Sequence, residues 1–124
     1  MVFDASAVLA HIGSEPGSDI VEEASADACM SAVNFSEVIA KLMERGLTAE
    51  QADDIVYRYG FDIIPFDEEM ARSTAALRPP TKALGLSLGD RACLALAQLK
   101  GLPVLTTDRS WTTVDLGLDV RLAR

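Results

Sequence analysis

Four acidic residues of the sequence lie beside apolar segments that are typical of buried strands or helices. Asp4 follows "MVF", Glu37 lies in "SAVNFSEVIAKL", Asp90 lies in "LSLGDRACLALA", and Asp108 ends "PVLTTD". Gathered carboxylates repel one another and raise each other's pKa unless a cation joins them. Oxygen ligands without His or Cys favour Mg²⁺ or Mn²⁺. Such a cluster suits phosphodiester hydrolysis, because bound metal activates water and stabilises the charge that develops on phosphate oxygens.

Taken one at a time, three of these acids have a sufficient structural explanation. Glu37 precedes Lys41 by four residues on a helical pattern, a pairing that stabilises a helix by only about 0.2–0.5 kcal/mol. Asp90 completes the capping-box pattern Ser87-x-x-Asp90, and Asp108 is suited to capping a short turn. Their common placement in the predicted fold favours a functional interpretation.

The segments around these acids predict an α/β fold. Short apolar runs alternate with helical patterns, which predicts a mainly parallel sheet between two layers of helices, a three-layer α/β/α sandwich. The predicted strands are 1–6, 28–32, 61–66, 103–108 and 119–123. The predicted helices are 6–13, 17–27, 31–46, 48–60, 67–77 and 86–101, and 78–85 is predicted to be a loop.

This fold brings the acids to one edge of the sheet. Ligands of parallel sheets bind outside the carboxyl ends of the strands, and both Asp4 and Asp108 follow a predicted strand. Glu37 and Asp90 reach the same crevice if their two helices flank the first strand. Within the helix at 86–101, we expect Ser87 to cap the backbone and to leave Asp90 turned toward the crevice.

Length and composition predict one domain, residues 1–124, in a cytoplasmic protein. The chain is 49% hydrophobic with a mean hydropathy of +0.19, yet no apolar run approaches the roughly 18 residues of a membrane span. The first residues carry an acid and no cationic segment, so no secretory signal is expected. Cys29 and Cys93 are expected to be buried free thiols. The single histidine, His11, makes zinc sites and histidine-dependent nucleophiles improbable.

The net charge of −8 is unevenly distributed along the chain. Residues 1–69 hold fifteen acidic side chains against three basic ones, whereas residues 70–124 hold eight basic side chains against four acidic ones. The overall excess of acid argues against nucleic-acid binding by bulk charge. A local basic face and an ordinary solvated surface both remain open for the basic residues Arg72, Arg78, Lys82, Arg91 and Arg109.

At the level of whole segments, the chain resembles PIN-domain ribonucleases, specifically the VapC-like toxins of toxin–antitoxin pairs. The segments that carry the resemblance are "VFDASAVLA", "AVNFSEVIAKL", "LSLGDRACLALA" and "VLTTDRSW", which follow the family's order and spacing across essentially the whole chain. The resemblance implies an α/β/α sandwich and an endoribonuclease that depends on Mg²⁺ or Mn²⁺. It also implies a frequent homodimer, with no membrane association, that is inhibited by a small antitoxin.

The resemblance also assigns roles to particular residues. The metal ligands and catalytic acids fall on Asp4, Glu37, Asp90 and Asp108, with Asp115 as a rival for the last position. Polar groups that orient carboxylates or water fall on Ser6, Asn34 and Thr106. Sequence position, and not the resemblance, suggests the basic residues that could reach RNA phosphates. Arg91 and Arg109 each follow a proposed ligand, and Arg78 and Lys82 lie in the predicted loop 78–85.

Two further expectations concern Trp111 and the class of function. A core position is favoured for Trp111 over stacking on an RNA base. The alternative to an enzyme is a non-catalytic PIN-like module that binds RNA or a protein partner without cutting it.

Overall fold

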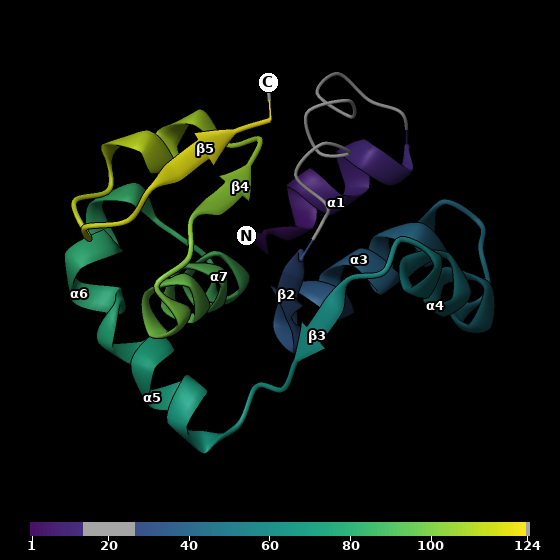
Figure 1. Ribbon diagram of the computed structural model, residues 1–124, viewed down its shortest axis with the longest axis horizontal. Helices are drawn as coiled ribbons and strands as arrows, with labels where there is room; N and C mark the ends of the chain where they lie inside the picture. Colours follow the sequence, from purple (N-terminus) through teal and green to yellow (C-terminus); the bar gives the residue numbers. More distant parts are fainter. Residues whose placement is uncertain (14–26, 124) are drawn as a thin grey trace.

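The computed structural model describes residues 1–13 and 27–123. Its centre is a five-stranded parallel sheet with the strand order β3-β2-β1-β4-β5 (Figure 1). The central strand β1 pairs with β2 on one side and β4 on the other, so that Val2 lies opposite both Cys29 and Val104. All five predicted strands are confirmed, with the bounds β1 Val2–Phe3, β2 Cys29–Ser31, β3 Asp62–Ile64, β4 Val104–Thr106 and β5 Val120–Leu122.

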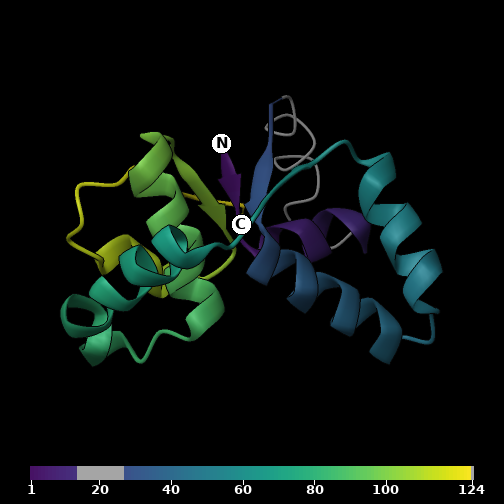
Figure 2. The ribbon, with the colours of Figure 1, turned by 90° about the horizontal axis from the view of Figure 1, so that it is seen from below.

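Helices cover both faces of this sheet, which gives the predicted three layers (Figure 2). One face carries α1 (Ala5–Ile12), α3 (Ala32–Glu44) and α4 (Ala49–Arg58), and the other carries α5 (Glu68–Ala76), α6 (Arg78–Thr81) and α7 (Leu88–Lys100). Successive strand side chains point to opposite faces. Accordingly Phe3, Met30 and Leu105 join the first core cluster, and Val2, Cys29 and Val104 join the second.

Local sequence signals set the helix ends. Thr48 and Gln51 form a capping box at the start of α4, with hydrogen bonds of 2.9 and 3.1 Å. Asp67 caps α5 by accepting from the amide of Met70 at 2.9 Å. Such caps satisfy amides that the first turn of a helix leaves without partners.

One element was predicted wrongly, and another lies outside the described residues. The segment 78–85 is not a plain loop, because it forms α6 and the 3₁₀ helix η1 (Lys82–Leu84). Pro79 and Pro80 lie in the first turn of α6, where the missing N–H groups have no helical partner to lose. The predicted helix at 17–27 falls almost entirely on residues 14–26, which are not described.

The core contains the residues expected to be buried. Trp111 lies in the 3₁₀ helix η2 (Arg109–Thr113) and is fully buried in the second cluster, as predicted. Cys29 and Cys93 are buried free thiols, and burial raises the pKa of each. No helix in residues 1–13 and 27–123 has the length and apolar character needed to cross a membrane.

Candidate active site

The strand order reverses direction at the centre of the sheet, between β1 and β4. From β1 the chain builds outward through β2 and β3, then returns to build β4 and β5 on the opposite side. Such a reversal opens a crevice at the carboxyl ends of the strands, which is the usual ligand site of this fold class. Asp4 follows β1 directly, and Thr106 ends β4 beside it.

Asp4 is held in this crevice by hydrogen bonds to both oxygens of its carboxylate. Its Oδ1 caps α1 by accepting from the amide of Ala7 at 2.8 Å and also accepts from the Ser6 hydroxyl at 2.7 Å. Its Oδ2 accepts from the Thr106 hydroxyl at 2.5 Å. Ser6 and Thr106 therefore both orient Asp4.

Burial changes the acidity of Asp4. The side chain is only 5% exposed, and loss of hydration raises its pKa from 3.8 to about 6. Hydrogen bonds from Thr106, Ala7 and Ser6 lower the pKa in opposition, and the negative charge of Asp90 raises it further. A cation in the crevice would lower the pKa of Asp4, because a nearby positive charge favours the ionised carboxylate.

Glu37 reaches the same crevice from α3. Its Oε1 accepts from Nδ2 of Asn34 at 2.8 Å, and that nitrogen also donates to the carbonyl oxygen of Gly89 at 3.0 Å. Lys41, the alternative partner of Glu37, instead pairs with Glu44 at 3.4 Å. Glu37 is thus held toward α7 by Asn34.

Asp90 takes part in the helix cap, as the capping-box pattern Ser87-x-x-Asp90 indicated. Ser87 Oγ accepts from the amide of Asp90 at 3.1 Å, and Asp90 Oδ2 accepts from the amide of Ser87 at 3.0 Å. The expectation that Asp90 makes no backbone bond was therefore wrong. The capping box is reciprocal because the side chain at the third helical position reaches back to the free amide of the capping residue.

Asp108 caps η2 at the end of β4. Its Oδ1 accepts from the amide and hydroxyl of Ser110 at 2.9 and 2.7 Å. Its amide donates to Thr106 Oγ1 at 3.0 Å, which links it to the residue that binds Asp4. Asp108 is exposed, whereas Asp4 is buried.

These acids line one small pocket of about 180 Å³. Its lining consists of Asp4, Ala5, Ser6, Asn34, Glu37, Asp90 and Asp108. The lining contains four carboxylates and no basic side chain. Its strongly negative character is the electrostatic setting in which a cation or a cationic side chain binds.

The donor set of this pocket fits a hard divalent cation. It offers carboxylate oxygens and an amide group, the ligands that Mg²⁺ and Mn²⁺ prefer. Asn34 is 1% exposed, and its Oδ1 is buried without a hydrogen-bond partner. An unsatisfied buried acceptor costs roughly 1–3 kcal/mol, which a bound water or ion would offset.

The side chains as they stand do not form a closed metal cage. Within the described part of the chain, no three His, Cys, Asp or Glu side chains are grouped so that they could hold an ion. Asp90 and Asp108 each use one carboxylate oxygen in the caps described above. The other oxygen of each remains available to a ligand.

The remaining predicted residues lie outside the pocket lining. Asp115 is exposed in the segment after η2. Arg91 is directed to α5, where Nη1 donates to the carbonyl oxygen of Thr74 at 3.3 Å. The other three basic residues proposed to contact RNA are exposed on α6, η1 and η2, namely Arg78, Lys82 and Arg109.

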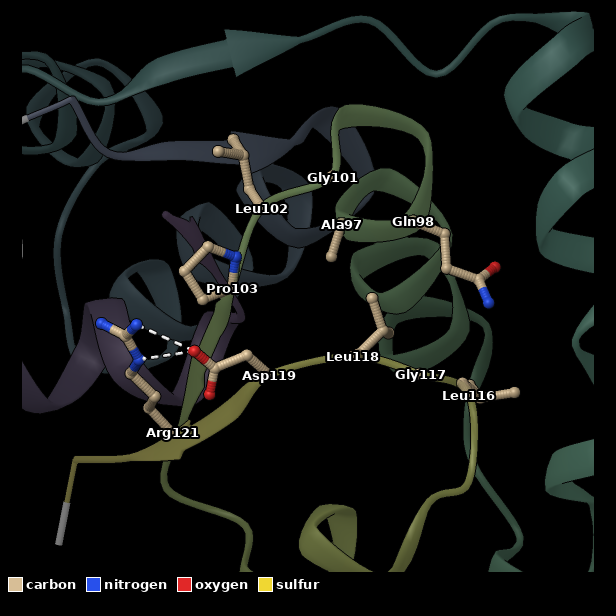
Figure 3. Close-up of a pocket in the computed structure, with 10 residues that line it drawn as sticks. All are labelled: Ala97, Gln98, Gly101, Leu102, Pro103, Leu116, Gly117, Leu118, Asp119 and Arg121. Carbon is tan, nitrogen blue, oxygen red and sulfur yellow. Dashed lines mark hydrogen bonds and ion pairs between the residues drawn. The ribbon is translucent and has the colours of Figure 1, made fainter.

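A larger cavity lies elsewhere in the described structure and has different chemistry. It measures about 500 Å³ and lies where α7 ends and β4 and β5 begin (Figure 3). Its only charged pair is satisfied internally, since Nη2 of Arg121 contacts Oδ2 of Asp119 at 2.8 Å. Composition, and not size, therefore identifies the acidic pocket as the candidate active site.

Gly89 is a site residue that sequence reasoning missed. It lies in the first turn of α7 beside Asp90, is buried, and contacts the Glu37 carboxylate. A signal was present in the sequence, because glycine inside a helical pattern is unfavourable and often has a packing reason.

Comparison with known proteins shows the family to which this chain belongs. The PIN domain family model matches residues 1–116. A VapC ribonuclease of Mycobacterium bovis and Ribonuclease VapC42 of Mycobacterium tuberculosis are each 32% identical over 126 residues, covering 94% of this chain and 96% of theirs. The chain therefore belongs to the PIN-domain family and is VapC-like within it.

Solved structures share the same fold. A toxin–antitoxin complex from Klebsiella pneumoniae has a chain with a TM-score of 0.76 and 24% identity, covering 99% of this chain and 97% of that one. A DNA-bound VapBC from Salmonella typhimurium gives a TM-score of 0.75 at 17% identity over the same shares of the two chains. The three-layer fold predicted from sequence is confirmed by these likenesses.

Proposed function

We propose that this protein is a metal-dependent endoribonuclease and the toxin of a toxin–antitoxin pair. The observation that carries the proposal is the convergence of Asp4, Glu37, Asp90 and Asp108 on one pocket without a basic side chain. The ribonuclease names of its relatives support the same class of enzyme. We further propose that residues 1–124 act as a single domain.

Mg²⁺ or Mn²⁺ is the proposed cofactor, and the four acids are its proposed ligands and the catalytic groups. The ion supplies an activated water and neutralises charge on the phosphate when it is bound. Ser6 and Thr106 hold the Asp4 carboxylate, and Asn34 holds that of Glu37. These hydrogen bonds fix the orientation of the ligating oxygens.

The proposed substrate is RNA, held through its phosphates. Arg78, Lys82 and Arg109 are exposed and are the proposed phosphate contacts. Arg91 is proposed with them, although reaching RNA requires it to leave Thr74. Phosphate contacts by Lys and Arg make binding weaken as salt rises.

The proposed partners are a cognate antitoxin and a second copy of this chain. The similar Klebsiella chain belongs to a toxin–antitoxin complex, which supports an antitoxin here. A basic antitoxin segment suits the acidic pocket, since an Arg or Lys pairs strongly with carboxylates. We expect complex formation to weaken with salt, and an affinity that is independent of salt would contradict this charge pairing.

RNA cleavage by the purified protein tests the enzymatic proposal. Structured RNA is incubated with the wild type in EDTA, Mg²⁺ or Mn²⁺, beside Asp4→Asn and Asp90→Asn variants. We expect cleavage only with a divalent ion and only by the wild type. Asp115→Asn is the matched control, because it removes an equal charge outside the pocket lining.

The outcomes separate the enzyme from the binding module. Equal cleavage by the wild type and both pocket variants would show that the acids are not the active site. Absence of cleavage with every RNA and metal would favour a non-catalytic module.

A further inference from the structure

Gly89 occupies a position where glycine is locally unfavourable. It is the second residue of α7 and is buried, between the exposed Leu88 and the pocket residue Asp90. Glycine has a lower helix propensity than alanine because it loses more conformational freedom when it is ordered. Its φ is not among the positive values recorded for the chain, so backbone conformation does not require glycine here.

The space beside Gly89 is filled by the carboxylate of Glu37. A Cβ at position 89 would lie 2.6 Å from Cδ and 2.8 Å from Oε2 of Glu37, and still closer to Oε1. Asn34 joins the two residues, because its Nδ2 donates both to Glu37 Oε1 and to the Gly89 carbonyl. The Glu37 carboxylate thus packs against the backbone of α7 at Gly89.

We propose that Gly89 is a positioning residue, whose missing side chain lets the Glu37 carboxylate lie against α7 next to Asp90. The inference rests on the proposed function, which assigns Glu37 to the active site. It adds to the proposed active site a residue that has no side chain and acts only by leaving space for Glu37. Any side chain at this position would move Glu37 away from Asn34.

The expected response to a side chain is local. Glu37 is exposed and its carboxylate ends a flexible chain, so it moves more readily than the buried helix α7. Gly89→Ala should therefore displace Glu37 and keep the fold. The gain in helix propensity offsets the loss of the hydrogen bond from Asn34 to Glu37.

Asn34 provides a direct spectroscopic probe, because it is the only asparagine in the sequence. Labelling with ¹⁵N-asparagine gives a single pair of side-chain amide signals. We expect Gly89→Ala to move this pair toward its position in Glu37→Ala, and Leu88→Ala to leave it unchanged. Signals in Gly89→Ala that match the wild type would overturn the proposal, and this measurement needs no RNA or metal.

Cleavage kinetics test whether the displacement matters. With Mn²⁺ present, we expect Gly89→Ala to lower kcat about 10- to 100-fold with little change in KM for RNA, as for other groups that orient metal ligands. The double variant with Glu37→Ala should be no slower than Glu37→Ala alone. Independent, multiplicative losses would contradict a role through Glu37.

Stability and activity distinguish the possible failures. We expect the thermal midpoint of Gly89→Ala to equal or exceed that of the wild type. A fall of several degrees with unchanged Asn34 signals would make Gly89 a packing residue and overturn the inference. If the wild type cleaves no RNA, the proposed function fails, while the Asn34 signals still decide whether Gly89 positions Glu37.

Discussion

The unusual acidity of Asp4 leads to a quantitative prediction about stability. Its pKa of about 6 in the folded protein lies about 2 units above the ordinary value of 3.8. Each unit corresponds to about 1.4 kcal/mol, so ionising buried Asp4 costs about 3 kcal/mol of folding free energy. Because the folded pKa is raised, this stability is fully present below about pH 4 and is lost as pH rises through about 6.

The perturbation is Asp4→Asn, which keeps the shape and removes the charge. The free energy of unfolding is measured by urea titration at intervals from about pH 4 to 8, in EDTA. We expect the variant to gain about 3 kcal/mol relative to the wild type across this range, because all other titrating groups are common to both. Asp115→Asn, which removes an exposed carboxylate, should show no such pH-dependent gain.

Two results would refute this reasoning. Parallel pH dependences for wild type and Asp4→Asn would show that burial does not raise the pKa of Asp4. Added Mn²⁺ should stabilise the wild type above pH 6 and not the variant, since only the ionised carboxylate attracts the ion. Equal stabilisation of both would place any bound ion away from Asp4.

The remaining predictions concern the groups around this carboxylate and the core. Thr106→Val removes a hydrogen bond that lowers the pKa of Asp4, so the acid limb of the pH–rate profile should move to higher pH. Ser87→Ala should reduce the free energy of unfolding by about 1 kcal/mol by chemical denaturation, and cleavage should persist because Asp90 is unchanged. Trp111→Ala should destabilise the fold by about 3–5 kcal/mol, as followed by circular dichroism, because the indole is fully buried.

The sequence correctly predicted the elements whose signals are local. Strands appeared as short apolar runs. The structure adds that the caps at Thr48 and Asp67 are equally local, because each side chain bonds an amide three residues away. The segment 78–85 was predicted to be a loop but contains α6 and η1, because the first turn of a helix tolerates its two prolines.

Asp90 illustrates how the sequence left two roles competing. The spacing from Ser87 indicated a capping box, and the expected position of its helix beside the first strand indicated a ligand for the pocket. The structure places Asp90 in both, with one oxygen bound to the Ser87 amide and the side chain lining the pocket. Sequence spacing alone does not show that the Asp90 carboxylate both caps the helix and lines the pocket. Its position at the pocket depends on how α7 packs against the rest of the fold.

The sequence by itself determined which acids follow which strands, and hence that the pocket is acidic. Several of their partners are local, such as Ser87 and Ser110. Only tertiary structure decided the contacts between residues that are distant in the chain. Asp4 is bound by Thr106, 102 residues away, and Asn34 bonds Gly89, 55 residues away. Such contacts, and the burial that raises the pKa of Asp4, arise where helices meet at the sheet edge. The helix and strand propensities of individual residues carry no information about how these helices pack at the sheet edge.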